Sequence, residues 1–374
     1  MIRKKQYISI VFLIGILAVT ASALALDTEE IDDVCQRALN NESLDADDLE
    51  VIDSFLFEAL EELLLSEDFS EIIGIKTEIS ARKGGSEHEQ YSSAFIASAQ
   101  KHLKSAFDEL QEWDQNELKT HIERNLIILV AEMESVDLIE FGISKLNAKD
   151  CVIRYWAVKS IANSRVAGYL NSEVTGDSEL AGIIIGKLEN MAQRENRAEI
   201  LDLIAGFADR FELPEARGLL LKIADLRINA YADWKVEYEL MDTGLLKSLA
   251  NEILSQASDQ QKVIVARKFA QLYSYVMQKY ILGAKLLNEA SKRQLASVMV
   301  EVEYLILDKL LGRPQSTIKR AIEKKSLSSL QREHDSLLGS NIRIGELGRR
   351  LNFDYGKSPG GRAITAPKTL PPPP

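Results

Sequence analysis

The chain has 374 residues, a formal net charge of −12 at pH 7 and a hydrophobic content of 46%, values typical of a folded protein long enough for two domains or one elongated array. With two cysteines in all, it is not a disulfide-dense scaffold. The acidic excess argues against nucleic acid as a partner, because the field of the folded chain would repel phosphate.

The N-terminus has the features of a secretory signal peptide in their usual order. A basic start at Arg3 to Lys5 precedes an apolar stretch from Ile8 to Val19, and Ala23-Leu24-Ala25 follows. Signal peptidases cleave after such an Ala-x-Ala sequence, so we predict that residues 1–25 are removed and that the mature chain starts at Leu26. We therefore expect an exported protein, either periplasmic or extracellular.

An uncleaved membrane anchor is the alternative interpretation of this segment. About 20 apolar residues, each adding about 1.5 Å, would cross a hydrocarbon core of roughly 30 Å. Thr20, Ala21 and Ser22 end the apolar run before the cleavage sequence, which favours removal. We expect membrane contact only if the segment stays uncleaved.

Charge is unevenly distributed along the mature chain. Acidic residues strongly outnumber basic ones from Leu26 to Lys149, whereas basic residues prevail from Asp150 onward. The two halves could attract each other within a molecule or between molecules, or they could simply be solvated helix surfaces, which is the interpretation that we prefer.

Between Leu26 and Gly312 the sequence favours helices almost throughout, and the fold class that we predict is all-α. Pro214 is the only proline in that stretch, and good helix formers fill most positions without alternating β-branched runs. A long helix is predicted after a capping box that begins at Ser86. Start signals and apolar spacing predict further helices over 45–62, 116–134, 177–194, 195–211, 214–240, 243–256, 259–282 and 288–311.

The predicted helices form pairs that recur about every 40 residues, at 116–147, at 150–191 and from 195 to about 231. A helix pair of this size cannot bury its own apolar face, so neighbouring pairs must stack, and the stacking predicts an α-solenoid, or superhelix. Within the second pair, the stretch from Asp150 to Ala162 resembles the first helix of a HEAT repeat. The residues that carry the resemblance are Asp150, Ile153, Arg154, Ala157, Val158 and Ile161.

The HEAT resemblance implies two kinds of packing role. In that family the small residues let the two helices of a repeat approach closely, and the Arg and Asp form polar links between successive repeats. The match covers one helix well, and the other repeats are degenerate. The predicted order is therefore an acidic helical cap or bundle over 26–115, HEAT-like repeats over 116–312, a basic helical segment over 313–356 and a disordered Pro/Gly-rich tail over 357–374.

Few residues suggest chemistry. The four histidines, His88, His102, His121 and His334, are scattered, and neither zinc-ligand spacing nor a nucleophile-elbow or phosphate-loop motif occurs in the sequence. Cys35 and Cys151 could pair in an oxidising compartment, but two separate buried thiols are the preferred interpretation. We predict no catalytic residue, no cofactor and no metal site.

Aromatic and basic residues gather around Trp156, Trp234 and Tyr275. On the concave helices of a solenoid they would offer amphipathic contact surface, although packing between repeats is the alternative use of the same side chains. The residues that we predict as partner contacts are Arg154, Tyr155, Lys159, Trp234 and Tyr238.

Together these features favour an exported, non-catalytic helical-repeat scaffold that binds a protein or peptide partner through an extended surface. Two alternatives stay open at the level of sequence. One is an envelope enzyme that acts on polysaccharide with a helical-toroid fold, whose acid and base residues would converge only in three dimensions. The other is a membrane-tethered assembly factor.

Overall fold

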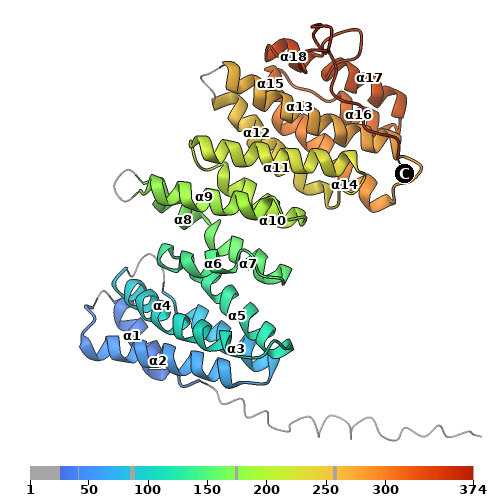
Figure 1. Ribbon diagram of the computed structural model, residues 1–374. Coiled ribbons are helices and arrows are strands. Elements are labelled where there is room, and N and C mark those ends of the chain that lie inside the picture. The colour runs from blue at the N-terminus through green and yellow to red at the C-terminus, as the bar shows by residue number, and fades with distance from the viewer. Residues whose placement is uncertain (1–25, 41, 85–88, 173–175, 256–258, 374) are drawn as a thin grey trace, which may run out of the picture. The chain divides into compact units, whose positions relative to one another are not determined.

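The computed structural model describes residues 26–40, 42–84, 89–172, 176–255 and 259–373, and it confirms the all-α class (Figure 1). Over these residues no β-strand forms, and bridging is confined to two isolated pairs, Gly339 with Ile344 and Lys357 with Ala363. Among the helices described, none combines the length and apolar character that a bilayer crossing requires. The predicted leader, 1–25, and the Ser86 capping signal lie outside the described residues. The chain divides into two compact units, 1–129 and 130–374.

The first unit is built around α2, which packs against α1, α3 and α4. Its start is fixed by the sequence: the Asp45 carboxylate accepts hydrogen bonds from the backbone N–H groups of Asp47 and Asp48, while Asp48 accepts one from the N–H of Asp45. This reciprocal capping satisfies N–H groups that a helix start leaves without partners. The helices that begin in this unit are α1 (Glu29–Leu39), α2 (Ala46–Leu65), α3 (Phe69–Ala81), α4 (Glu89–Gln111) and α5 (Glu117–Met133).

A polar cluster joins α2 to α4 in this unit. The carboxylate of Asp53 accepts hydrogen bonds from Ser98 Oγ at 2.7 Å and Lys101 Nζ at 2.8 Å, and it contacts His102 Nε2 at 2.9 Å. These contacts, with Lys101 the strongest, lower the pKa of Asp53 to about 2. Since the unfolded carboxylate titrates near 3.8, the stabilisation is complete above that pH and is lost as the pH falls towards 2.

We expect an Asp53→Asn variant to lose this acid-sensitive part of its stability. Between pH 5 and pH 2.5 the unfolding free energy of the first unit should fall by up to about 1 kcal/mol more in the wild type than in the variant. The effect is small because the carboxylate is well solvated. Urea titrations at the two pH values, followed by hydrogen exchange in α2 and α4, measure the difference. The exposed Asp33→Asn variant is the matched control, and equal acid sensitivity of Asp53→Asn and wild type would contradict the assignment.

The second unit consists of two rows of helices. In one row, α7 contacts α10, α10 contacts α12, and α12 contacts α14. In the other row, α9 contacts α11, and α11 contacts α13. Helices α10, α11, α12 and α13 also contact their neighbours in sequence. The helices, shown in Figure 1, are η1 (Val136–Leu138), α6 (Ile139–Lys145), α7 (Cys151–Ile161), α8 (Ser164–Leu170), α9 (Ser178–Ala192), α10 (Ala198–Ala208), α11 (Pro214–Ala232), η2 (Glu239–Met241), α12 (Asp242–Ser255), α13 (Asp259–Leu282), α14 (Glu289–Val302), the π-turn η3 (Glu303–Leu307), α15 (Asp308–Leu311), α16 (Thr317–Glu323), α17 (Leu327–Leu337) and α18 (Glu346–Arg350).

Helices α6 and α7 approach each other closely at Gly142. A Cβ atom added there would lie 2.3 Å from Ser160 Oγ and 2.9 Å from Ile161 Cγ1. Because Ser160 and Ile161 are buried, neither can move aside cheaply. The glycine therefore sets the separation of this helix pair.

We expect Gly142→Ala to destabilise the second unit by about 1–3 kcal/mol, because overpacking outweighs the gain in helix propensity. Gly206 in α10 is the matched control, since a Cβ added there meets nothing within 4 Å. Gly206→Ala should stabilise by about 0.5–1 kcal/mol. Chemical unfolding of both variants checks that the two changes in unfolding free energy have opposite signs. A Gly142→Ala variant more stable than the wild type would refute the prediction.

The predicted helix 214–240 is too long, since α11 ends at Ala232. Trp234 has φ of 58°, and its N–H and that of Lys235 donate to the carbonyls of Tyr231 and Ala230. This is the Schellman ending, which usually places glycine where Trp234 stands. Tyr238 is also left-handed, with φ of 52°. Residues 233–238 therefore form an irregular loop instead of two more helical turns.

The prediction of disorder over 357–374 is also corrected, as far as residue 373. A hairpin-like turn pairs the Tyr355 N–H with the carbonyl of Ile364 and the Ile364 N–H with that of Gly356. Farther on, Leu370 is 2% exposed. The composition of the segment indicates no fold of its own, but side chains elsewhere in the second unit supply the partners that its backbone lacks.

Candidate functional site

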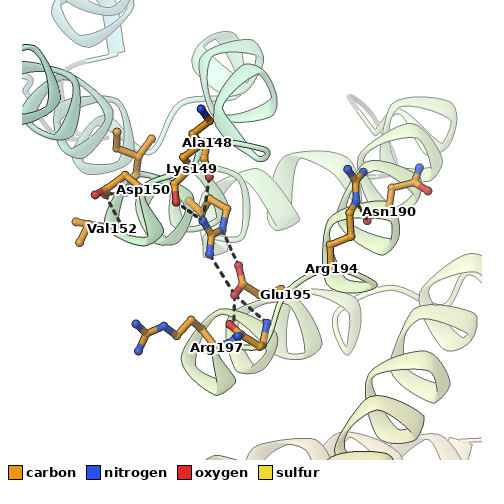
Figure 2. Close-up of polar contacts among 11 residues, drawn as sticks. Ala148, Lys149, Asp150, Val152, Asn190, Arg194, Glu195 and Arg197 are labelled. Atoms are coloured by element: carbon orange, nitrogen blue, oxygen red, sulfur yellow. Dashed lines mark hydrogen bonds and ion pairs between the residues drawn. The ribbon is translucent and has the colours of Figure 1, made fainter. Parts of the chain in front are cut away.

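Arg154 lies at the start of α7 and joins two loops. Asp150 caps this helix, as predicted, by accepting from the N–H groups of Val152 and Ile153. The guanidinium donates to the carbonyls of Ala148 and Lys149, both at 2.9 Å, and through Nε to Glu195 Oε2 at 2.7 Å. Figure 2 shows these two carbonyls and Glu195 converging around one guanidinium.

Glu195 in turn organises the start of α10. Its Oε1 atom accepts from the N–H groups of Asn196 and Arg197, each at 3.0 Å (Figure 2). Burial opposes ionisation of this carboxyl, but the hydrogen bonds from Arg154 and from the backbone hold its pKa below the usual value. The Arg154–Glu195 pair therefore ties the loop before α7 to the loop before α10.

Comparable links recur through the second unit with nearly constant sequence separation. The Arg154–Glu195 pair spans 41 residues. The others are Asn171 Nδ2 to Arg210 O over 39 residues, Lys279 to Glu239 over 40, Asn251 to Asp209 over 42 and Lys268 to Asp225 over 43. Each link therefore joins positions about one helix pair apart.

A charged cleft of about 880 Å³ opens beside the Arg154–Glu195 pair. The starts of α7 and α10, one side of α11 and the loop over 233–237 supply its walls. Its basic residues are Lys149, Arg154, Arg197, Arg227 and Lys235, and its acidic residues are Asp150, Glu195, Asp233 and Glu237. A cleft lined by charges of both signs suits a polar peptide better than an apolar small molecule.

A second hollow, of about 520 Å³, shares Cys151 and Arg197 with the cleft and is more apolar. Tyr155 lines it, together with Ile200 and Met241. Cys151 and Cys35 are both free thiols, and each is half-buried, whereas the preferred interpretation expected them to be buried.

The structure brings together some of the predicted contact residues and not others. Arg154 lines the charged cleft, and Tyr155 lines the adjoining hollow. Trp234 and Tyr238 belong to the loop whose residues 233, 235 and 237 form the cleft wall. Lys159 lines neither the cleft nor the hollow. Its ammonium lies 4.3 Å from the ring centroid of Trp156 on the same helix, which is a cation–π contact within α7.

Buried charges hold the 233–238 loop in place. Arg227 donates to both carboxylate oxygens of Asp242, at 2.7 and 3.0 Å, and to the carbonyl of Glu237. Lys279 donates to Glu239 at 2.9 Å and to the carbonyl of Val236. All four of these charged side chains are at most 6% exposed. The loop is therefore preorganised, which offsets the strain of its left-handed residues.

A hydrogen-bonded chain on α13 and α17 runs from the exposed carboxylate of Asp335 through the buried side chain of His334 to that of Ser274. His334 Nδ1 lies 2.9 Å from Asp335 Oδ1, and its Nε2 lies 2.8 Å from Ser274 Oγ. Burial lowers the pKa of His334. The Asp335 carboxylate can only accept, so Nδ1 donates to it, and in the neutral imidazole Nε2 is then the acceptor for the Ser274 hydroxyl. Ser274 is 0% exposed and accepts a further hydrogen bond from Gln278 Nε2. Geometry of this kind fixes the amide of Gln278 rather than presenting a nucleophile.

Sequence reasoning missed these buried groups. The sequence gives no sign that His334 pairs with Ser274, because the two residues are 60 positions apart. Arg227 and Lys279 each stand in an apolar helical stretch, which is the signal that marks them as candidates for buried pairing. Within the described residues, no group of three or more His, Cys, Asp or Glu side chains could hold a metal ion.

No protein-family model matches the chain, and no match was found among curated proteins or solved structures.

Proposed function

We propose that the second unit is a HEAT-like α-solenoid and that the protein is an exported, non-catalytic scaffold. Two features support the solenoid: the two rows of helices, and polar links that join residues 39 to 43 positions apart. Repeated neighbour-to-neighbour contacts of this kind distinguish a stacked array from a bundle around one centre. The Arg154–Glu195 pair supports the role that the HEAT resemblance implies for Arg154.

We infer that a partner protein binds at the charged cleft and the 233–238 loop. The observation that carries this inference is the loop itself, which holds two left-handed aromatic residues in place through two buried ion pairs. Tyr238 is 43% exposed there. Rigid, amphipathic tyrosine and tryptophan side chains beside a charged wall are typical of protein-binding surfaces.

The test is mild affinity capture of the tagged full-length protein from its native envelope, compared between charge-reversal variants. Lys235→Glu changes an exposed residue of the cleft, and Lys187→Glu is a matched control on an exposed face of α9. We expect a captured protein that Lys235→Glu weakens at least about tenfold and Lys187→Glu leaves unchanged. Equal capture by both variants would remove the cleft from the proposal.

Export is part of the proposal and has its own test. We expect the intact mass of the protein recovered outside the cytoplasm to correspond to a chain that starts at Leu26, because Ala23-Leu24-Ala25 is a cleavage sequence. An Ala25→Arg variant should accumulate with its leader attached. Recovery of the wild-type chain with all 374 residues would instead support the anchored form.

A further inference from the structure

The chain's own C-terminal segment lies across α13 and is held by its main chain. Lys368 N–H donates to Gln271 Oε1 at 2.8 Å, and its carbonyl accepts from Gln271 Nε2 at 3.3 Å and Gln278 Nε2 at 3.1 Å. Leu370 N–H donates to Gln278 Oε1 at 2.6 Å. The indole N–H of Trp234 donates to the carbonyl of Pro371 at 2.9 Å.

These contacts are made to backbone N–H and carbonyl groups of the segment rather than to its side chains. The two glutamine amides each offer a donor and an acceptor, which matches the pattern of a peptide strand. Trp234 adds the indole-to-carbonyl bond by which aromatic-lined grooves commonly hold proline-rich ligands. Trp234 has a left-handed backbone and lies beyond the end of α11.

Burial along the segment follows a period of three. Pro367 and Leu370 are buried and Pro373 is half-buried, whereas the four residues between them, Lys368, Thr369, Pro371 and Pro372, are exposed. Polyproline II has three residues per turn, so one of its edges carries every third residue. The segment therefore binds as a proline-rich peptide would, with one edge in the groove.

The groove is preorganised from beneath. Gln278 Nε2 is shared between Lys368 O and Ser274 Oγ, and Ser274 is fixed by His334. Gln278 and His334 are each 6% exposed. Buried polar groups that are hydrogen-bonded to one another fix the orientation of the outermost group of the chain. Here that group is the side-chain amide of Gln278, which forms hydrogen bonds with the backbone of Lys368 and Leu370.

We propose that Gln271, Gln278 and Trp234 form a binding site for an extended, Leu-Pro-Pro-containing segment of a partner protein, and that residues 366–373 occupy it as a tethered competitor. The inference rests on the proposed function in that the partner is a protein, and it names the chemistry that the partner presents. While attached, it competes at an effective concentration of order millimolar and weakens the binding of any free peptide.

The experiment uses the full chain and a fluorescent synthetic peptide with the sequence of residues 366–374. Leu370→Asp in the protein puts a charge at a buried position and releases the tail. We expect this variant to bind the peptide at least about tenfold more tightly than the wild-type chain, measured by fluorescence anisotropy. Adding Gln278→Glu, which replaces the amide donor by a carboxylate, should abolish binding, and a peptide carrying the same Leu-to-Asp change should not bind.

A second measurement covers the case in which Leu370→Asp does not fold. Excess peptide added to the wild-type chain should speed hydrogen exchange at the Lys368 and Leu370 amides of the protein's own tail, because these amides lose their glutamine partners on displacement. Equal peptide affinity of wild type and Leu370→Asp, no binding to either, or unchanged exchange would overturn the inference. The capture experiment with Lys235→Glu does not depend on the peptide experiment. A failure of the peptide experiment would therefore leave the proposed role of the cleft standing.

Discussion

Replacing Arg227 by methionine is expected to destabilise the second unit by about 3–5 kcal/mol. The guanidinium is 6% exposed and pairs with Asp242, which is 1% exposed. Methionine fills much of the same volume, so the loss comes mainly from a carboxylate that stays buried without its counter-ion. Tyr231, which donates to the same carboxylate at 2.7 Å, is too weak a donor to replace the guanidinium.

The measurement is hydrogen exchange across α11 and α12 in increasing urea, which gives the unfolding free energy of this region. The double variant Arg227→Met/Asp242→Asn should recover part of the loss, because the asparagine carries no charge and its amide oxygen still accepts from Tyr231. Arg217→Met breaks a pair with Glu252 that is less buried, with side chains 17% and 12% exposed, and should cost less. If Arg227→Met and Arg217→Met cost the same, burial of the charge is not the cause.

Replacing Phe269 by alanine is the second large effect, also about 3–5 kcal/mol. Phe269 is 0% exposed on α13, the helix that packs against α11, α12 and α14. Truncation removes a ring from the centre of the unit and leaves a cavity that these helices cannot close without losing their other contacts.

Phe269→Leu is the matched control, since it keeps most of the apolar volume and should cost about 1 kcal/mol. The same exchange experiment, read across α11 to α14, checks both variants. Because peptide binding uses Gln278 and Trp234, the leucine variant should also keep its affinity for the tail peptide. A cost for Phe269→Ala below about 1 kcal/mol would show that α13 is not central to the core.

Helix starts were predictable from sequence because they depend on residues close together in the chain. Asp45 and Asp150 cap the helices that follow them, and Pro214 occupies the first turn of α11. The end of α11 was not predictable in the same way. The stretch after Ala232 keeps helical spacing, and the bonds from Arg227 to the carbonyl of Glu237 and from Lys279 to the carbonyl of Val236, which hold the 233–238 loop, carry no signal in the local sequence.

The candidate site was predictable in part. The clustering of aromatic and basic residues pointed to Trp234 and Tyr238, which lie in the loop, and to Arg154, which lines the cleft. It could not distinguish a side chain that links two parts of the fold, such as Arg154, from one that is free to contact a partner. Gln271 and Gln278 carry no signal of their own, because an amide on a helix is ordinarily solvated. Their partners lie about 90 residues farther along the chain, and composition alone marked that segment as disordered.

Site-specific photo-crosslinking tests the central claim, that a partner binds at the cleft and the 233–238 loop, most directly. A photoreactive phenylalanine derivative would replace Tyr155 or Tyr238 in the full-length protein, with Tyr169, 41% exposed on α8, as the control. We predict one protein adduct of the same mass from positions 155 and 238 and none from position 169. Adducts of equal yield from all three positions, or none from position 238, would contradict the account.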